Sequence, residues 1–371
     1  MNKKQWLGLG LVTVAAIGLA ACGNRASKKD SANSESKTDL KAAIITDTGG
    51  VDDKSFNQSA WEGLQAWGKE NGLSKGNGFD YFQSTDESQY ATNLDEAVSN
   101  DYKLIFGVGF ALSDSVKKAA KDNQDVNYVI IDDRIEGQKN VASAVYADNE
   151  AGYLAGIAAA KTTKTKQVGF VGGMESEVIT RFRAGFEAGV KSVDPSIKVQ
   201  VDYAGSFGDS AKGKTIAAAQ YAEDFNNPEK GRTIAATQYA AGADVIYQAA
   251  GGTGAGVFKE AKDLNEKKNE DEKVWVLGVD RDQKAEGEYT SKDGKKSNFV
   301  LASSLKKVGE SVKDLAKKTA EGKFPGGKVI TYSLKDGGVD LTTDNLSADA
   351  KKAVEDAKAK ILDGSLKVPE K

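Results

Sequence analysis

Acidic, aromatic and glycine residues recur directly after short apolar segments of this chain. The first segment, residues 42–46, is followed by DTGGVDDKSFNQ (47–58), which combines three acids with a phenylalanine. Similar combinations follow other apolar segments, at GVGFALSD (107–114), IIDD (130–133), YQAAGGTGAG (247–256) and GVDRD (278–282). Each one alone is also compatible with an ordinary turn, for example one in which Ser55 or Asn57 caps a helix. Together they favour a cleft lined by acids, amides and aromatic rings.

The composition excludes much of enzyme chemistry. The chain contains no histidine and a single cysteine, Cys22, so it has no imidazole base, no histidine metal ligand and no internal disulfide. Carboxylate pairs, serine–lysine dyads and carboxylate metal sites remain possible. Acidic residues outnumber basic ones, 54 to 51, which argues against nucleic acid as a partner. We therefore predict that the chain is not an enzyme and carries no metal or cofactor.

The glycine run at 251–256 has two readings. It opens a predicted helix after a predicted strand, as phosphate-binding loops do. It lacks the Gly-Lys-Ser/Thr ending of a P-loop, and no dinucleotide fingerprint stands at the first strand. A tight turn, or a close backbone approach to a neutral ligand, is the preferred interpretation.

Elements that could position these residues follow from the hydrophobic pattern. Apolar segments rich in β-branched residues predict strands at 42–46, 104–108, 126–131, 168–171, 197–201, 245–249, 274–279 and 329–332. Helical patterns lie between most of them, at 57–69, 113–121, 151–160, 179–190, 254–264 and 305–319. This alternation indicates an α/β fold with buried parallel sheets, in which ligands bind beyond the carboxyl ends of the strands. About 330 residues follow position 40, which suits two domains.

The N-terminus has the layout of a secretory signal. Lys3 and Lys4 precede about sixteen uncharged residues (6–21), and Cys22 follows at once. With cysteine first after the cleavage point, the segment resembles a bacterial lipobox; an incidental cysteine beside an ordinary signal peptide is the alternative. Residues 24–39 are polar and lack aromatic and branched aliphatic side chains, so we expect a flexible tether. The predicted location is the outer face of the cell membrane, with a lipid anchor on Cys22.

Several motifs in order carry a specific resemblance. They are AIITDTGGVDDKSFNQSAWEG, GVGFALSD, VIID, YADNEAGYLAGIAAA, VGFVGGMES, DVIYQAAGGTGAGVF and WVLGVDRDQ, which together extend over about residues 40–365. The chain resembles the basic membrane protein family of lipoproteins, most closely its purine nucleoside receptor branch. The resemblance implies a two-lobed periplasmic-binding-protein type I fold. The expected division is a signal peptide (1–21), a tether (22–39), a first lobe (40–150, with a returning segment at about 275–300) and a second lobe (151–274, with 301–371).

The resemblance also implies a ligand site. Asp47 matches an acid that bonds a purine base, and Phe56 and Tyr247 match rings that cover its two faces. Asn57 and Asp132 match polar contacts to the base, while Gly252, Asp280 and Lys306 match the group that holds ribose hydroxyls. An exposed helix lysine is the alternative reading of Lys306, and a capping turn is that of Asp280.

A local repeat departs from the family pattern. Residues 212–221 (KGKTIAAAQY) recur at 230–239 (KGRTIAATQY), with eight of ten positions identical. The family has one such helix at this place. The second copy directly precedes the strand at 245–249, so we expect it to occupy the helix position.

The function that the resemblance implies is capture of nucleosides, with purine nucleosides favoured, for an ABC transporter permease, by a monomer held at the membrane through its lipid. A receptor of the same fold for a sugar or another small polar ligand is the first alternative. A lipid-anchored hydrolase that uses carboxylates, or a surface adhesin, is the second.

Overall fold

The computed structural model describes residues 37–206 and 225–371. The predicted signal segment, Cys22, most of the tether and the first repeat copy (212–221) lie outside the described residues. Within the described part, no helix is both long and apolar enough to pass through a bilayer.

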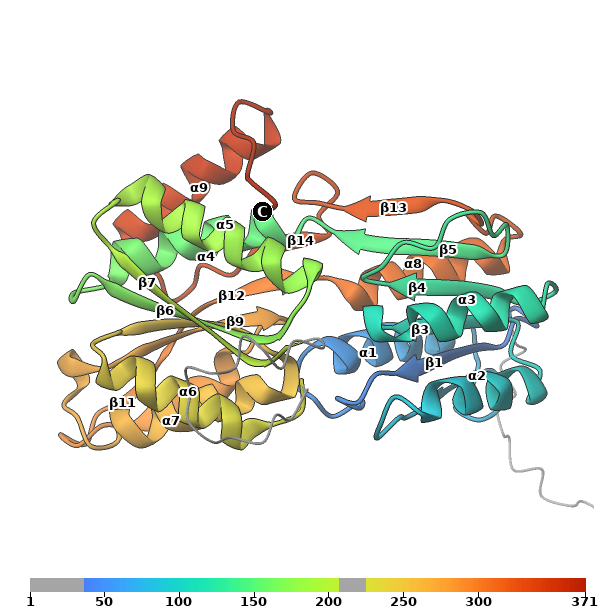
Figure 1. The fold of residues 1–371 in the computed structure, drawn as a ribbon, viewed down its shortest axis with the longest axis horizontal. Helices are drawn as coiled ribbons and strands as arrows, with labels where there is room; N and C mark the ends of the chain where they lie inside the picture. The colour runs from blue at the N-terminus through green and yellow to red at the C-terminus, as the bar shows by residue number, and fades with distance from the viewer. Residues whose placement is uncertain (1–36, 207–224) are drawn as a thin grey trace, which may run out of the picture. The chain divides into compact units, whose positions relative to one another are not determined.

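One six-stranded parallel sheet forms the first lobe (Figure 1). Its strand order is β13-β5-β4-β3-β1-β2, and every neighbouring pair is parallel. The strands are β1 (Ala42–Thr46), β2 (Phe79–Phe82), β3 (Leu104–Val108), β4 (Asn127–Ile131), β5 (Val141–Tyr146) and β13 (Val329–Tyr332). Four helices cover it: α1 (Phe56–Glu70) and α8 (Val308–Ala320) on one face, α2 (Gln89–Ser99) and α3 (Ser113–Asp122) on the other.

A second six-stranded sheet forms the second lobe, in the order β14-β12-β9-β8-β6-β7. Among the described strands of this sheet, only the β12–β14 pair is antiparallel. The strands are β6 (Gln167–Glu175), β7 (Lys198–Ser206), β8 (Val245–Ala249), β9 (Trp275–Asp280), β12 (Val300–Lys306) and β14 (Val339–Leu341), with a hairpin of β10 (Glu288–Thr290) and β11 (Lys296–Asn298) beside them. One face carries α4 (Asp148–Thr162), α5 (Glu177–Val193) and α9 (Ala348–Leu362), and the other α6 (Pro228–Ala240) and α7 (Gly254–Asn265).

The central strands of each sheet are buried on both faces, which explains their continuous apolar sequence. In β1, Ala42 and Ile44 pack into one core cluster, whereas Ala43 and Ile45 pack into another on the opposite face. Successive side chains of a strand point to opposite faces, so a strand between two helix layers must be apolar at every position. The α/β prediction with two helix-flanked parallel sheets is confirmed.

Three crossovers join the lobes, and they correct the predicted division. They run from β5 to α4, from β12 to α8 and from β13 to β14. The segment 275–300 was predicted to return to the first lobe, but its strand β9 lies inside the second sheet. The segment that returns is 308–332, which supplies α8 and β13. Hydrophobic periodicity identifies a buried strand but does not say which of two similar sheets it joins.

The helices pack closely where glycines face one another. A Cβ atom on Gly156 of α4 would lie 2.2 Å from the carbonyl oxygen of Phe186 in α5. Likewise a Cβ on Gly63 of α1 would lie 2.1 Å from the carbonyl oxygen of Gly309, at the start of α8. These contacts bring helix backbones together beside the crossovers, and no larger side chain fits there without movement of the backbone.

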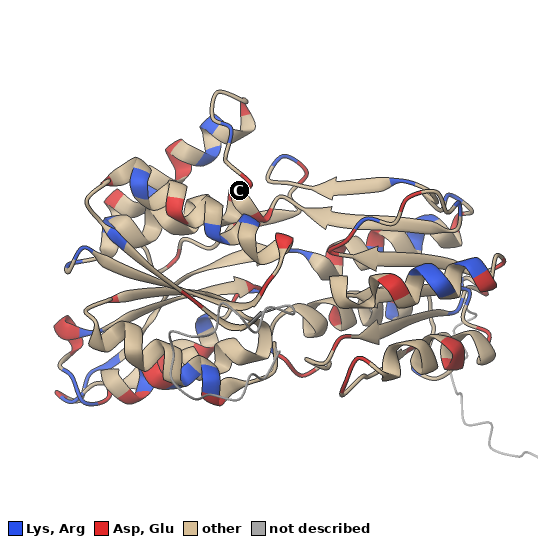
Figure 2. Ribbon diagram, viewed as in Figure 1, with Lys and Arg blue, Asp and Glu red and all other residues tan. Residues whose placement is uncertain are grey.

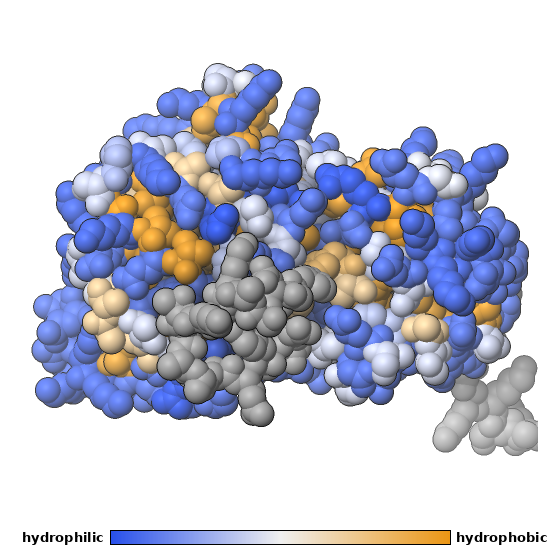
Figure 3. Space-filling model, in the orientation of Figure 1, coloured by the Kyte–Doolittle hydropathy of each residue, from blue (hydrophilic) through white to orange (hydrophobic). Residues whose placement is uncertain are grey.

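Basic and acidic side chains are interspersed over both lobes (Figure 2). Hydrophilic residues cover most of the face in Figure 3, with smaller apolar areas between them. Among the described large hydrophobic residues, Val329 and Leu362 are exposed. The near-balanced surface agrees with the small net charge of −3.

Candidate ligand-binding site

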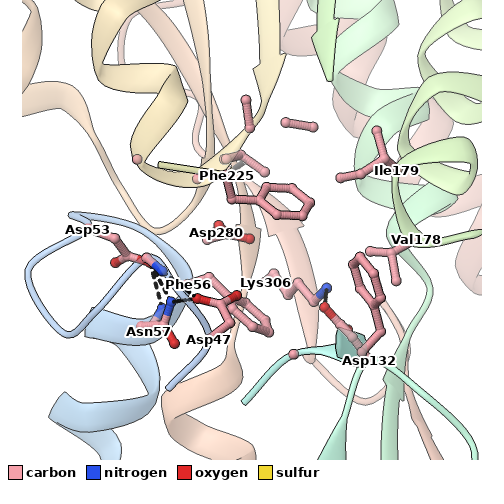
Figure 4. Close-up of a pocket in the computed structure, with 18 of the residues that line it drawn as sticks. Asp47, Asp53, Phe56, Asn57, Asp132, Val178, Ile179, Phe225, Asp280 and Lys306 are labelled. Carbon is pink, nitrogen blue, oxygen red and sulfur yellow. Dashed lines mark hydrogen bonds and ion pairs between the residues drawn. The ribbon is translucent and has the colours of Figure 1, made fainter. Parts of the chain in front are cut away.

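A cavity lies where the carboxyl ends of strands from the two sheets meet (Figure 4). Residues after β1, β3 and β4 approach it from the first lobe, and residues at the ends of β8, β9 and β12 approach it from the second. This is the position at which open parallel sheets bind ligands. The lining residues are Asp47, Gly49, Asp53, Phe56, Asn57, Gly109, Phe110 and Asp132 from the first lobe, with Val178, Ile179, Phe182, Phe225, Ala249, Ala250, Gly251, Gly252, Val279, Asp280 and Lys306 from the second.

Seven of the eight predicted ligand contacts line this single cavity. They are Asp47, Phe56, Asn57, Asp132, Gly252, Asp280 and Lys306. The exception is Tyr247.

The loop after β1 is held by carboxylates. Asp53 accepts hydrogen bonds from the backbone N–H groups of Ser55 (2.9 Å), Asn57 (2.8 Å) and Gln58 (3.1 Å). Asp53 therefore caps α1, rather than Ser55 or Asn57. The Asn57 amide donates from Nδ2 to Asp53 Oδ2 at 3.1 Å and to Asp47 Oδ1 at 2.7 Å. This arrangement fixes the Asp47 carboxylate at the edge of the cavity (Figure 4).

Asp280 ends β9 in an unusual conformation. Its φ is 65°, and Asp132 at the end of β4 has a φ of 73°, so both acids adopt the left-handed region that few non-glycine residues enter. Ser55 of the first lobe donates a hydrogen bond from its hydroxyl to Asp280 Oδ2. Burial raises the pKa of Asp280 to about 7, although the nearby Lys306 charge and the Ser55 bond oppose this shift. Strained backbone at both acids is typical of functional positions.

Lys306 is the buried cation of the cavity. Its ammonium donates to Asp132 Oδ2 at 2.6 Å and forms an ion pair with Asp148 Oδ1 at 3.2 Å. Burial by itself would lower the pKa of Lys306, but the surrounding carboxylates, Asp132 first, raise it overall, so the group stays charged. Lys306 ends strand β12 and is 1% exposed, which excludes the alternative of a solvated helix lysine.

Phenylalanine rings supply the apolar walls. Phe56 begins α1, and Phe225 precedes α6; the two lie on opposite sides of the cavity in Figure 4. Phe225 packs edge-on against Phe110, with ring centroids 6.1 Å apart. Phe182 of α5 also lines the cavity. Lys306 Nζ lies 5.2 Å from the Phe56 ring centroid and 5.6 Å from that of Phe182.

The structure corrects the role predicted for Tyr247. Its side chain is 0% exposed and lies in the core, with its ring centroid 5.2 Å from that of Phe186. The hydroxyl hydrogen bonds with Ser304 Oγ at 2.7 Å. Tyr247 stands in the middle of β8, so its direction follows the pleat of the strand toward the α5 side of the sheet. Phe225, on a loop, takes the place opposite Phe56 instead.

The repeat offers a sequence signal that could have identified Phe225. At the same 18-residue offset, Phe207 stands before the first copy and Phe225 before the second. The second copy forms α6 directly before β8, which confirms the expectation that it holds the helix position. Asp53 was visible in the sequence only as one of three acids, and nothing in its local pattern identified it as the cap.

Deletion of residues 207–224 is expected to leave folding and ligand binding intact. The cavity residues named above all lie outside the deleted segment, and its two flanking residues, Ser206 and Phe225, both lie beside the end of β6. Ser206 pairs with Glu175, while a Cβ on Gly173 would lie 2.3 Å from the Phe225 ring. The unfolding midpoint should stay within about 2 °C of the parent value by calorimetry. A larger fall, or lost binding, would show that the segment contributes; Phe225→Ala in the shortened chain should still weaken binding.

Comparisons with known proteins place the chain in a family. A family model named Bmp, described as ABC transporter substrate-binding protein PnrA-like, matches residues 40–223 and 218–371. The two matches overlap at residues 218–223, at the end of the first repeat copy and just after it. The "ABC transporter nucleoside-binding protein BmpA" of Lactococcus lactis subsp. cremoris is 55% identical over 369 residues, which cover 100% of both chains.

"Basic membrane protein D" of Borreliella burgdorferi is 33% identical over 357 residues, 92% of this chain and 91% of that protein. Among solved structures, an ABC transporter solute-binding protein from Aeropyrum pernix K1 has a TM-score of 0.73 at 24% identity, and the match covers 90% of this chain and 94% of that one. The structural match supports the two-lobed fold alone. The family model matches residues 40–371 in two overlapping parts, and the chain therefore belongs to the Bmp family of PnrA-like ABC transporter substrate-binding proteins.

Proposed function

We propose that this protein captures nucleosides, with purine nucleosides preferred, and delivers them to an ABC permease. The observation that carries the proposal is the pairing of aromatic walls with buried carboxylates in one interlobe cavity. A purine base has two flat apolar faces and polar edges, and a ribose has hydroxyl groups that donate hydrogen bonds. Phe56 and Phe225 suit the base faces, Asp47 and Asp132 its edges, and Asp280 with Lys306 the ribose. The name of the Lactococcus relative supports the same ligand class.

The polar atoms of the cavity fit a ligand rich in donors. Asp132 Oδ1 and Asn57 Oδ1 are buried and have no hydrogen-bond partner among the described residues. Buried acceptors of this kind are nearly always satisfied in proteins, here by donors of a ligand or by water.

A calorimetric screen tests this function. The chain from residue 36 onward, which forms one compact unit, would be titrated with inosine, guanosine, adenosine, cytidine, uridine and ribose. We expect binding of purine nucleosides, weaker binding of pyrimidine nucleosides and none of ribose at the same concentrations. Binding of sugars alone would favour the alternative sugar receptor, and conversion of a nucleoside to products would reveal an enzyme.

We further propose that the mature protein is anchored outside the cytoplasm through lipid on Cys22. The support is the sequence order of charged start, apolar segment and lone cysteine. Cys22→Ser should release the protein from the membrane fraction and leave nucleoside affinity unchanged, since stable anchoring requires the acyl chains. Retention of the variant in washed membranes would contradict the lipid anchor.

Nucleoside affinity is expected to rise with pH through neutrality. Ribose hydroxyls that donate to Asp280 favour its ionised form, so below its pKa of about 7 binding must first remove a proton. Affinity at pH 5.5 should therefore be about thirty-fold weaker than at pH 8.5, as calorimetry would measure. No histidine titrates in this range, because the chain has none.

Asp280→Asn is the matched control for this pH dependence and should flatten the profile. The same substitution should also change the heat stability of the unliganded protein, in a direction that the raised pKa of Asp280 determines. Burial raises the pKa of Asp280 in the folded state, so ionisation above the ordinary value of 3.8 costs the unliganded protein stability. The variant should therefore be more heat-stable than the parent at pH 8, with the gain lost near pH 4. An unchanged pH profile in the variant would assign the titration to another group, with Asp53 the first candidate, since burial also raises its pKa.

A further inference from the structure

Four buried charged residues form a connected network that extends beyond the cavity. Arg181 donates to Asp148 Oδ2 from Nε at 3.1 Å and from Nη2 at 2.9 Å. The other oxygen of Asp148 forms the ion pair with Lys306, and Lys306 bonds to Asp132. Their exposed fractions are 8% for Arg181, 0% for Asp148, 1% for Lys306 and 9% for Asp132. Neither Asp148 nor Arg181 lines the ligand cavity.

The network crosses from one lobe to the other. Lys306 ends β12 of the second sheet, Arg181 lies on α5 of the same lobe, and Asp148 begins α4 just after the first crossover. Asp132 alone comes from the first lobe. Arg181, Asp148 and Lys306 thus form a unit within one lobe, and Asp132 of the other lobe contacts it directly through Lys306 (Figure 4).

The charges explain why Arg181 is needed. Lys306 lies among Asp132, Asp148 and Asp280, three acids against one ammonium. Arg181 bonds to Oδ2 of Asp148, and Lys306 pairs with Oδ1. The four-residue network therefore contains two cations and two acids. Without Arg181, the full charge of Asp148 would attract the ammonium away from Asp132.

We propose that Asp148 and Arg181 are positioning residues for ligand binding: they hold the Lys306 ammonium in place so that Asp132 of the first lobe and the ligand can engage it. The affinity part of this proposal rests on the proposed nucleoside function. The positioning part concerns the Lys306 ammonium itself and is measurable without ligand.

Paired substitutions separate positioning from general stability. Arg181→Met should lower both the unfolding midpoint and the inosine affinity, and the affinity should fall by about ten-fold. The reason is that the buried Asp148 carboxylate loses its guanidinium partner. Asp148→Asn combined with Arg181→Met removes one charge of each sign, so the midpoint should return most of the way to the parent value. The affinity of the double variant should stay about ten-fold below the parent, because Lys306 has lost its anchor in the second lobe. Arg181→Lys should restore part of the affinity.

Arg183→Met is the matched control, since it makes the same change on α5 at a residue outside the network. It should leave inosine affinity unchanged. Recovery of affinity together with the midpoint in the double variant would overturn the positioning role, as would an Arg181→Met variant with lowered stability and parent affinity.

A ligand-free measurement distinguishes failure of this inference from failure of the proposed function. The NMR signal of the Lys306 side-chain ammonium, identified by its absence from Lys306→Met, should exchange with solvent much faster in the double variant than in the parent. Unchanged exchange would overturn the inference even if nucleosides bind. If the ammonium exchanges faster in the double variant but the parent protein binds no nucleoside, the positioning role is supported and the proposed ligand class is refuted.

Discussion

Lys306→Met is expected to abolish measurable nucleoside binding and to lower the free energy of unfolding by about 3–5 kcal/mol. Lys306 is 1% exposed and pairs with two acids, Asp132 at 2.6 Å and Asp148 at 3.2 Å. Methionine matches the length of the side chain but leaves carboxylates buried beside an apolar group. Removal of one partner of a buried ion pair costs far more than the pair contributes, because the remaining charge has neither water nor counterion. Chemical denaturation and calorimetric titration would measure the two effects.

Two further variants test this reasoning. Lys317→Met removes an exposed lysine of α8 and should change the free energy of unfolding by less than about 0.5 kcal/mol. Asp132→Asn added to Lys306→Met should recover part of the lost stability, since Asp148 keeps Arg181 as its partner and the acid that loses its ion pair, Asp132, is replaced by a neutral amide. Parent-like stability of Lys306→Met would show that the acids near it are solvated rather than buried.

Phe56→Ala is expected to weaken purine nucleoside binding by about five-fold to more than a hundred-fold, with a small change in the stability of the unliganded protein. Stacking of a base on an aromatic side chain contributes roughly 1–3 kcal/mol, as measured by alanine substitution. Phe56 lines the cavity and is only partly buried against the core. Removal of its ring should therefore reduce the free energy of ligand binding more than the free energy of unfolding. Calorimetric titration of the variant with inosine checks the first effect, and thermal unfolding without ligand checks the second.

Two control variants compare Phe56, whose ring lines the cavity, with Tyr247, whose ring lies in the core. Phe56→Tyr keeps a stacking surface and should retain most of the affinity. Tyr247→Phe removes the hydroxyl that bonds to Ser304 and should cost about 1 kcal/mol of stability with little effect on affinity. Unfolding of Phe56→Ala would show that Phe56 is a core residue. A large affinity loss in Tyr247→Phe would show that the Tyr247 hydroxyl, or its bond to Ser304, contributes to the ligand site.

Local pattern determined the kind of fold and the edge at which the site lies. The apolar segment 42–46 was predicted as a strand and is β1, because both of its faces are covered and every position must be apolar. The carboxyl ends of parallel strands meet at one edge of a sheet, so acids and rings after successive strands converge wherever the chain runs in between. The rule predicts Asp47 and Asp132 at one sheet edge and Asp280 at a strand end of the same kind, whereas the meeting of the two edges depends on tertiary structure.

Tertiary structure alone decided which lobe each late segment joins and what surrounds each side chain. Residues 305–306 were predicted to begin a helix, yet they end β12, because pairing with β9 and β14 outweighs the local helical pattern. Tyr247 points into the core and Phe225 into the cavity, although the sequence shows both simply as aromatics near glycines or turns. The partners of Lys306 come from positions 132 and 148, which are close to it only after both sheets have formed. Electrostatic and packing contacts between distant segments depend on positions in space, and hydrophobic periodicity along the chain carries no record of them.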